Sequence, residues 1–175
     1  MASSNSTEIR KHVLIVGSGS VGKRHAENFS RLGCDISSVD PRLDRRNEMQ
    51  LKFDAKNVYN HLDEALAENT SFTGVVVCSP PKWHIEQTLQ SVEMRLPVFL
   101  EKPPAKDLVG VMRLQNYIDS SGIEADNAIL MGYTWRWWPA LRYMREVLTQ
   151  ELIGKPYLAR FHVSAHLADW HPWED

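Results

Sequence analysis

A glycine-rich segment, Gly17-Ser-Gly-Ser-Val-Gly22, constrains the fold of this chain more than any other feature. It directly follows a short apolar run, His12–Val16, which has the length and composition of a buried strand. After it, apolar and small residues recur at helical spacing over Val21–Leu32, and Gly33 is a signal for the end of a helix. The sequence therefore predicts a strand that turns sharply into a helix.

The three glycines have distinct expected roles in a dinucleotide-binding turn. Gly17 permits the tight turn, Gly19 lets the backbone approach a pyrophosphate, and Gly22 lets the helix lie close to the sheet. Free N–H groups at the start of the helix would face the anion. The alternative is a plain strand-to-helix turn with no ligand. The residues expected to bind the cofactor here are Gly17, Gly19, Ser20, Val21 and Gly22.

Strands and helices alternate through the next 120 or so residues, by the same periodicity criteria. Strands are expected at 36–39, 58–59, 75–78, 97–100 and 128–133, and helices at 43–53, 62–67, 83–94, 107–118 and 139–148. Near-continuous apolar strands that alternate with helices indicate a parallel sheet covered on both faces. We therefore predict a doubly wound α/β fold of the Rossmann type.

The alternation ends beyond residue 150. Pro156–Ala168 has the pattern of an antiparallel strand, which we interpret as the first strand of a truncated second α+β domain. The predicted domains are a disordered N-terminus at 1–10, a dinucleotide-binding domain at 11–133, and a linker helix with the start of a substrate domain at 134–175.

Asp40 ends the second predicted strand, where a carboxylate would accept hydrogen bonds from an adenosine ribose and repel a 2′-phosphate. This favours NAD over NADP. Three nearby arginines weaken that preference, because each could pair with a phosphate. They could equally form a solvated helix face or salt bridges with Asp44 or Glu48. They are Arg42, which we count among the cofactor-binding candidates, Arg45 and Arg46.

Glu101-Lys102-Pro103 follows another parallel strand at its carboxyl end, where doubly wound sheets bind ligands. Lys102 could donate a hydrogen bond to the oxygen of a hydroxyl or carbonyl undergoing hydride transfer, and Glu101 could orient it. The alternative is an exposed loop lysine.

The order of several motifs resembles the Gfo/Idh/MocA oxidoreductase family over residues 11 to 170. The matching segments are Gly17 to Gly22, Asp40, Cys78-Ser-Pro-Pro-Lys-Trp-His84, Glu101-Lys102-Pro103, Tyr133-Thr-Trp-Arg-Trp-Trp-Pro139 and Ile153-Gly-Lys-Pro156. By this resemblance, Lys102 and Glu101 are catalytic and contact the cofactor, with a bond before Pro103 that is often cis. Ser79, Pro80 and His84 lie beside the nicotinamide, and Arg136 lies near the cofactor.

The resemblance implies hydride transfer between NAD (or NADP) and a hydroxyl or carbonyl carbon of a sugar, amino sugar or cyclitol. It also implies a homo-oligomer and a further domain with a large open sheet, before which this chain ends at Asp175. Two alternatives stay open. The chain could be a non-catalytic nucleotide-binding module, or an inactive fragment without its substrate domain.

Composition limits the other function classes. A net charge of -2 gives no general attraction to nucleic acid or to anionic membranes. Cys34 and Cys78 have no metal-binding or disulfide spacing, so we expect buried, reduced thiols in a cytoplasmic protein. His162 and His166 would share one face of a strand, but their spacing is generic and we assign no metal site.

The aromatic cluster of Trp135, Trp137 and Trp138 is expected to pack between two domains rather than to stack on a sugar. If the second domain is absent, this apolar surface would favour self-association of the chain.

Overall fold

The computed structural model describes residues 10–68, 71–124 and 128–164 of the 175-residue chain. Its elements are β1 (His12–Val16), α1 (Ser20–Arg31), β2 (Asp35–Val39), α2 (Leu43–Phe53), β3 (Val58–Tyr59), α3 (Leu62–Ala67), β4 (Gly74–Val77), α4 (Pro81–Glu93), β5 (Val98–Leu100), α5 (Leu108–Ser121), β6 (Ile129–Met131), the 3-10 helix η1 (Thr134–Trp137) and α7 (Pro139–Thr149).

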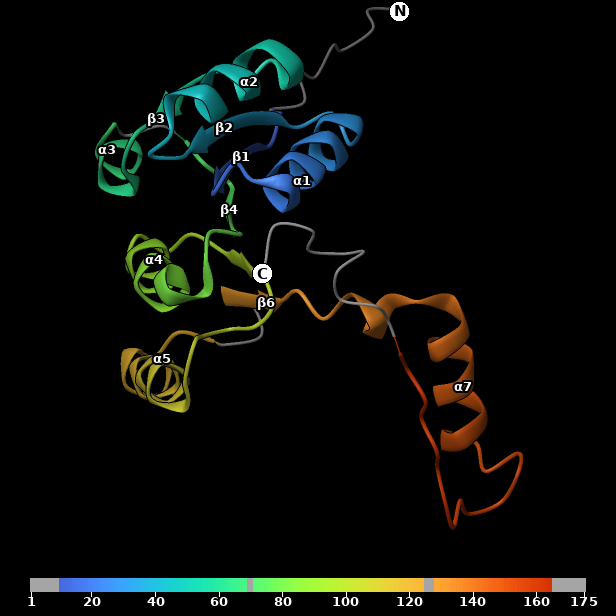
Figure 1. Ribbon diagram of the computed structural model, residues 1–175. Coiled ribbons are helices and arrows are strands. Elements are labelled where there is room, and N and C mark those ends of the chain that lie inside the picture. The colour runs from blue at the N-terminus through green and yellow to red at the C-terminus, as the bar shows by residue number, and fades with distance from the viewer. Residues whose placement is uncertain (1–9, 69–70, 125–127, 165–175) are drawn as a thin grey trace, which may run out of the picture. The chain divides into compact units, whose positions relative to one another are not determined.

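The strands form one parallel sheet in the order β3-β2-β1-β4-β5-β6 (Figure 1). This is the order of a doubly wound dinucleotide-binding fold, in which the chain reverses its direction of winding between β1 and β4. The predicted fold class is confirmed. Ligands in such sheets bind at the carboxyl ends of the strands beside this reversal.

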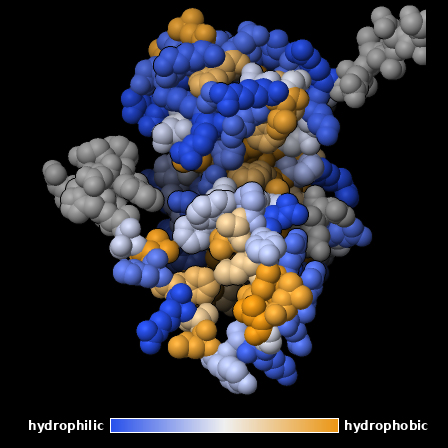
Figure 2. Space-filling model, turned by 90° about the vertical axis from the view of Figure 1, so that its right-hand side faces the viewer, coloured by the Kyte–Doolittle hydropathy of each residue, from blue (hydrophilic) through white to orange (hydrophobic). Residues whose placement is uncertain are grey.

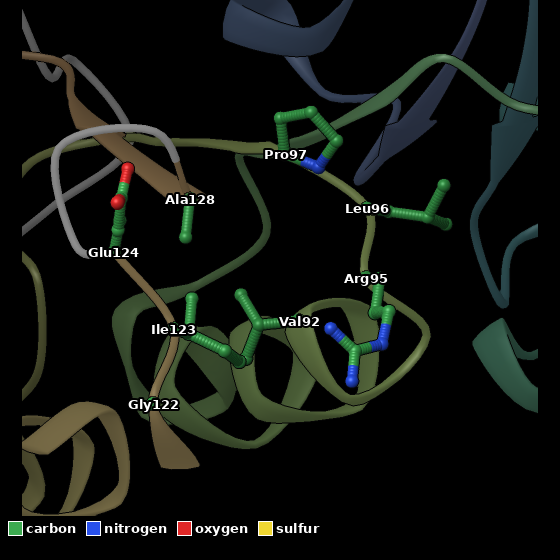
Figure 3. Close-up of a pocket in the computed structure, with 8 residues that line it drawn as sticks. All are labelled: Val92, Arg95, Leu96, Pro97, Gly122, Ile123, Glu124 and Ala128. Carbon is green, nitrogen blue, oxygen red and sulfur yellow. The ribbon is translucent and has the colours of Figure 1, made fainter.

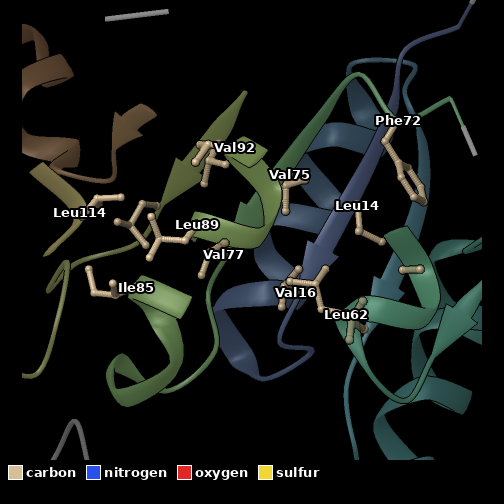
Figure 4. Packing of buried hydrophobic residues seen from close by; sticks show 14 of the residues in the cluster. Leu14, Val16, Leu62, Phe72, Val75, Val77, Ile85, Leu89, Val92 and Leu114 are labelled. Carbon is tan, nitrogen blue, oxygen red and sulfur yellow. The ribbon is translucent and has the colours of Figure 1, made fainter. Parts of the chain in front are cut away.

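Alternate residues of the central strands pack against opposite layers of helices. Leu14 and Val77 belong to a buried cluster with residues of α3, α4 and α5, part of which Figure 4 shows. Ile15 and Val76 point to the other face, where Ala26 of α1 and Met49 of α2 are fully buried. Burial on both faces explains why these strands are apolar without alternation.

The predicted strands and helices of the first 133 residues are all present, with shifts at their ends. α4 begins at Pro81 instead of Trp83, because proline is well suited to the first turn of a helix. α5 extends to Ser121 and ends at Gly122, whose positive φ of 67° suits the position after a helix.

The chain divides into two compact units between Tyr133 and Thr134. The second unit contains η1 and α7, as the periodicity of Pro139–Leu148 predicts. The strand predicted at Pro156–Ala168 is wrong for residues 156–164, which form no strand. A strand needs a neighbour to pair with its backbone groups, and the structure describes none beside this segment. Residues 165–168 lie outside the described residues.

Large apolar side chains are exposed in both units, and Figure 2 shows hydrophobic patches among hydrophilic ones on one face. In the first unit, Leu130 of β6 is 50% exposed. In the second, Trp135, Trp137 and Trp138 are each more than half exposed, and the rings of Trp135 and Trp138 lie 6.2 Å apart. The expected packing of these tryptophans between domains, and self-association of the chain, stay predictions.

The described residues include no helix long and apolar enough to cross a membrane.

Candidate functional site

A cavity of about 610 Å³ opens at the carboxyl ends of β1, β2 and β4. Its walls come from the glycine-rich turn, the end of β2 with the start of α2, and the start of α4. The lining residues are Val16, Gly17, Gly19, Ser20, Val21, Val39, Asp40, Pro41, Arg42, Arg45, Asn60, His61, Leu62, Cys78, Ser79, Pro80, Lys82, Trp83 and Gln87. The fold thus brings together the glycine motif, Asp40 and the segment after β4.

The glycine-rich turn has the backbone geometry that the motif predicts. Gly17 has a φ of 97°, a conformation that side chains with a Cβ rarely adopt, and its N–H donates to the Val39 carbonyl at 2.8 Å. Lys23 N–H makes a helical bond to Gly19 O at 3.0 Å. The N–H groups of Ser20, Val21 and Gly22 therefore have no partners within α1.

Gly22 is buried and does not line the cavity. A Cβ at this position would lie 1.9 Å from the carbonyl oxygen of Gly17. Gly22 thus permits the close approach of α1 to the turn, and its place among the cofactor-binding residues stays a prediction.

Asp40 is 2% exposed, and its carboxylate organises the floor of the cavity. Oδ2 accepts the Ser18 N–H at 2.8 Å, and Oδ1 accepts the Arg42 N–H at 2.9 Å. Asp40 thereby links the glycine-rich turn to the start of α2. This structural role comes in addition to the predicted contact with ribose, and the sequence did not indicate it.

The three arginines have different partners. Arg42 forms a salt bridge with Asp44 at 2.6 Å, one of the partners considered from the sequence. This hydrogen bond raises the pKa of Arg42 and lowers that of Asp44, although both groups are in solvent. Arg46 donates to the Asp40 carbonyl at 2.7 Å and to the Asn60 side chain at 3.0 Å.

Arg45 lines the cavity and approaches Asp40 Oδ2 only at 3.4 Å. Its guanidinium is the least firmly paired of the three, so Arg45 is better placed than Arg46 to meet an anion in the cavity. Glu48, the other carboxylate considered as a partner, instead pairs with Lys23 and Lys52, which lower its pKa.

The segment after β4 forms the opposite wall. Ser79 Oγ donates to the side chain of Gln87 at 2.5 Å, and both residues line the cavity. The Cys78 thiol donates to the carbonyls of Val16 and Gly17, and burial raises its pKa strongly. Cys34 and Cys78 are free, as predicted, but both are only partly buried.

His84 does not line the cavity, and its expected position beside the nicotinamide stays a prediction. The side chain is 1% exposed and lies behind the wall, because it projects from α4 into the protein. Its Nε2 lies 2.7 Å from the Ser79 carbonyl and its Nδ1 lies 2.8 Å from the Pro103 carbonyl. His84 therefore connects the cavity wall with the loop after β5.

Glu101 and Lys102 follow β5, and neither lines the cavity. The bond between Lys102 and Pro103 is cis, in agreement with the family resemblance. Lys102 is exposed. Glu101 Oε1 lies 2.8 Å from His25 Nε2, while Oε2 accepts the Lys102 N–H at 3.2 Å. Glu101 thus orients the backbone of Lys102, and its carboxylate is engaged by His25 rather than by the lysine ammonium.

Sequence reasoning missed His25. A usable signal existed, because His25 lies four residues from both Val21 and Phe29, in the stripe of α1 that faces the sheet. A polar residue in such a stripe needs a partner inside the protein. Gln87, Asn60 and His61 were missed because nothing in their local sequence distinguishes them.

The remaining predicted positions lie elsewhere. Arg136 is in the second unit, within η1. His162 is exposed, and His166 lies outside the described residues. Among the described residues, no three metal-binding side chains are grouped.

A second cavity of about 240 Å³ lies at the opposite end of the sheet (Figure 3). Its lining includes Val92, Leu96 and Ile123 and carries charged side chains only at Arg95 and Glu124. It precedes β5 and β6, whereas ligands of doubly wound sheets bind beyond the carboxyl ends of the strands. We therefore assign no role to it.

Comparison with known proteins gives a family match over residues 11–125, to an oxidoreductase family with an NAD-binding Rossmann fold. A myo-inositol 2-dehydrogenase of Thermotoga maritima is 30% identical over 148 residues, which are 83% of this chain and 43% of that protein. An inositol 2-dehydrogenase of Acidothermus cellulolyticus is 28% identical over 162 residues, which are 90% of this chain and 44% of that protein.

Solved structures agree in fold. A probable dehydrogenase from Thermotoga maritima matches with a TM-score of 0.73 and 26% identity, covering 83% of this chain and 43% of the other. The scyllo-inositol dehydrogenase from Lactobacillus casei, solved with NAD(H) and scyllo-inositol, matches with a TM-score of 0.74 and 21% identity, covering 83% and 42%.

This chain thus spans less than half the length of the curated relatives that it matches. The family match covers most of the chain and includes strands β1 to β5, the glycine-rich turn and the cavity described above. The chain belongs to the Gfo/Idh/MocA family of oxidoreductases with an NAD-binding Rossmann fold.

Proposed function

We propose that the cavity binds NAD and that this chain is the cofactor-binding part of an oxidoreductase acting on a hydroxyl or carbonyl carbon of a cyclitol, sugar or amino sugar. The observation that carries the proposal is the juxtaposition of the glycine-rich turn, Asp40 and Ser79 around one cavity at the carboxyl ends of the strands. The cyclitol preference follows from the inositol dehydrogenases among the relatives.

The cavity suits a dinucleotide in volume and in chemistry. Its volume of about 610 Å³ lies within the usual range of small-molecule sites. The N–H groups of Ser20 and Val21, which line the cavity and have no partners within α1, suit a pyrophosphate. Bound NAD would supply the hydride acceptor, while the protein binds, orients and excludes water.

The charge around Asp40 supports NAD over NADP. Its buried carboxylate would repel a 2′-phosphate, whereas Oδ1 accepts one backbone N–H and retains capacity for a ribose hydroxyl. Arg45 is the residue through which NADP could still bind.

The test is a calorimetric titration of the purified chain with NAD and with NADP. We expect micromolar binding of NAD and binding of NADP at least tenfold weaker, a difference of about 1.4 kcal/mol. If neither NAD nor NADP produced a binding heat, the cavity would lack its proposed ligand and the proposal would fail.

Lys102 is proposed to donate a hydrogen bond to the reacting oxygen of the substrate. Its side chain is exposed, so the Lys102→Ala change removes no buried contact. We expect this variant to bind NAD as the parent does. With a polyol that the parent protein oxidises, its turnover should be roughly 10²- to 10⁴-fold lower. Lys106→Ala, which removes another exposed lysine of the same loop, is the matched control. Equal turnover in Lys102→Ala and Lys106→Ala would refute the role.

The same proposal includes three further parts. They are the domain division at 11–133 and 134–175, the contact of Arg136 with the cofactor, and a homo-oligomeric state. They are supported by the family membership and by the division of the chain between Tyr133 and Thr134.

A further inference from the structure

Two histidines from different helices reach the short segment that carries Lys102. His25 of α1 lies 2.8 Å from the carboxylate of Glu101, the residue before Lys102. His84 of α4 lies 2.8 Å from the carbonyl of Pro103, the residue after it. The segment 101–103 is therefore tied on both sides of the lysine.

The tie on the first side is a shielded carboxylate–imidazole pair. The side chains of His25 and Glu101 are 16% and 13% exposed. The His25 ring meets the Phe99 ring edge-on at 5.0 Å and lies 6.5 Å from the Phe29 ring. Hydrogen bonds to a carboxylate in such surroundings are stronger than those at an open surface. The pair fixes the carboxylate that in turn accepts the Lys102 N–H.

The tie on the second side depends on the His84 ring nitrogen that faces the loop after β5. The Nδ1 atom lies 2.8 Å from the Pro103 carbonyl oxygen, and Nε2 lies 2.7 Å from the Ser79 carbonyl oxygen. Carbonyl oxygens only accept hydrogen bonds, so the bond to Pro103 needs a proton on Nδ1. In that tautomer the buried ring of His84 holds the Pro103 carbonyl against α4.

We propose that His25 and His84 are positioning residues that hold the segment 101–103 from both sides, so that Lys102 keeps its ammonium group free at the carboxyl end of β5. His25 contacts the charged carboxylate of Glu101, whereas His84 contacts two backbone carbonyl groups. No described residue forms an ion pair with the Lys102 ammonium. The proposal rests on the role given to Lys102 above.

The first test is nitrogen NMR of the chain labelled with ¹⁵N-histidine near neutral pH, which reports the protonation of each ring nitrogen without any variant. We expect a proton on Nδ1 of His84, the nitrogen that faces the Pro103 carbonyl. A bare Nδ1 would leave no donor for that carbonyl and would overturn the two-sided tie.

The second test is the hydrogen-exchange rate of the Lys102 amide, with the amide of Ile15 in the central strand β1 as an internal reference. In His25→Leu and His84→Leu we expect the Lys102 amide to exchange roughly five- to tenfold faster, because that factor corresponds to the loss of about one hydrogen bond. In His25→Gln and His84→Gln the exchange rate should recover in part. Ile15 reports any general loss of stability, which would accelerate both amides.

His12→Leu is the matched control, because His12 is a partly buried histidine near the amino end of the sheet and contacts Ser37 at 2.9 Å. Exchange at Lys102 that is no faster in His25→Leu and His84→Leu than in His12→Leu would overturn the proposal. NAD titration of the same samples separates this result from the function proposed above, because NAD binding can fail while the histidine ties persist.

Discussion

Replacing Gly22 with alanine is expected to destabilise the folded chain by about 3 kcal/mol or more and to abolish NAD binding. The new Cβ would lie 1.9 Å from the carbonyl oxygen of Gly17 and 3.3 Å from the Cys78 sulfur. The nearer atom belongs to the backbone, so α1 or the turn must move as a whole. Urea unfolding followed by circular dichroism should show the loss as a lower midpoint with little change in slope.

Gly19→Ala is the informative contrast. A Cβ on Gly19 has one neighbour within 4 Å, the Arg45 guanidinium at 3.8 Å, and the backbone is extended there. We therefore expect the free energy of unfolding to stay within about 0.5 kcal/mol of the parent. NAD affinity should nevertheless fall at least roughly tenfold, because the Cβ occupies the approach of a pyrophosphate to the start of α1. Unaltered NAD affinity in Gly19→Ala would contradict the assignment of the phosphate site.

Replacing Asp40 with alanine is expected to weaken NAD binding by roughly 100-fold. The change removes the proposed acceptor for the ribose, and it leaves the N–H groups of Ser18 and Arg42 without the carboxylate that now binds them. Loss of a partner for a buried donor costs about 1–3 kcal/mol, so the variant should also unfold at lower urea concentration. Calorimetric titration with NAD measures the dissociation constant of the variant and of the parent chain.

Two further variants separate charge from structure at this position. Asp44→Ala removes a fully exposed carboxylate that pairs with Arg42, and it should leave both NAD affinity and stability nearly unchanged. Asp40→Asn keeps one of the two acceptor oxygens and loses the negative charge, so NADP binding should gain relative to NAD binding. If Asp40→Ala bound NAD as tightly as Asp44→Ala, Asp40 would have no part in cofactor binding.

Much of the fold could be predicted because its signals are local. The run His12–Val16, the glycine-rich turn and the periodicity of the following helix each occupy a few consecutive residues, and the structure confirms all three. Even the two-residue strand Val58–Tyr59 was predictable. The strand predicted at Pro156–Ala168, which is wrong for residues 156–164, shows the limit, since a strand exists only with a partner and alternation alone supplies none.

The candidate site was predictable only in part. Gly17 and Asp40 stand at sequence positions that the topology of a doubly wound sheet brings to one edge, and they line the same cavity. The second role of Asp40, as acceptor for the Ser18 N–H, depends on a contact across 22 residues. His25 and Glu101 are 76 residues apart, and no periodicity relates them.

The sequence by itself determined the parallel α/β fold, the glycine-rich turn at the start of α1 and the position of the charged pair after β5. These depend on short-range patterns and on a small set of allowed sheet topologies. Only the tertiary structure decided which groups meet. It directs the Glu101 carboxylate to His25 and buries His84 between two carbonyls, because hydrogen-bond partners of buried polar groups are chosen by packing in three dimensions rather than by distance along the chain.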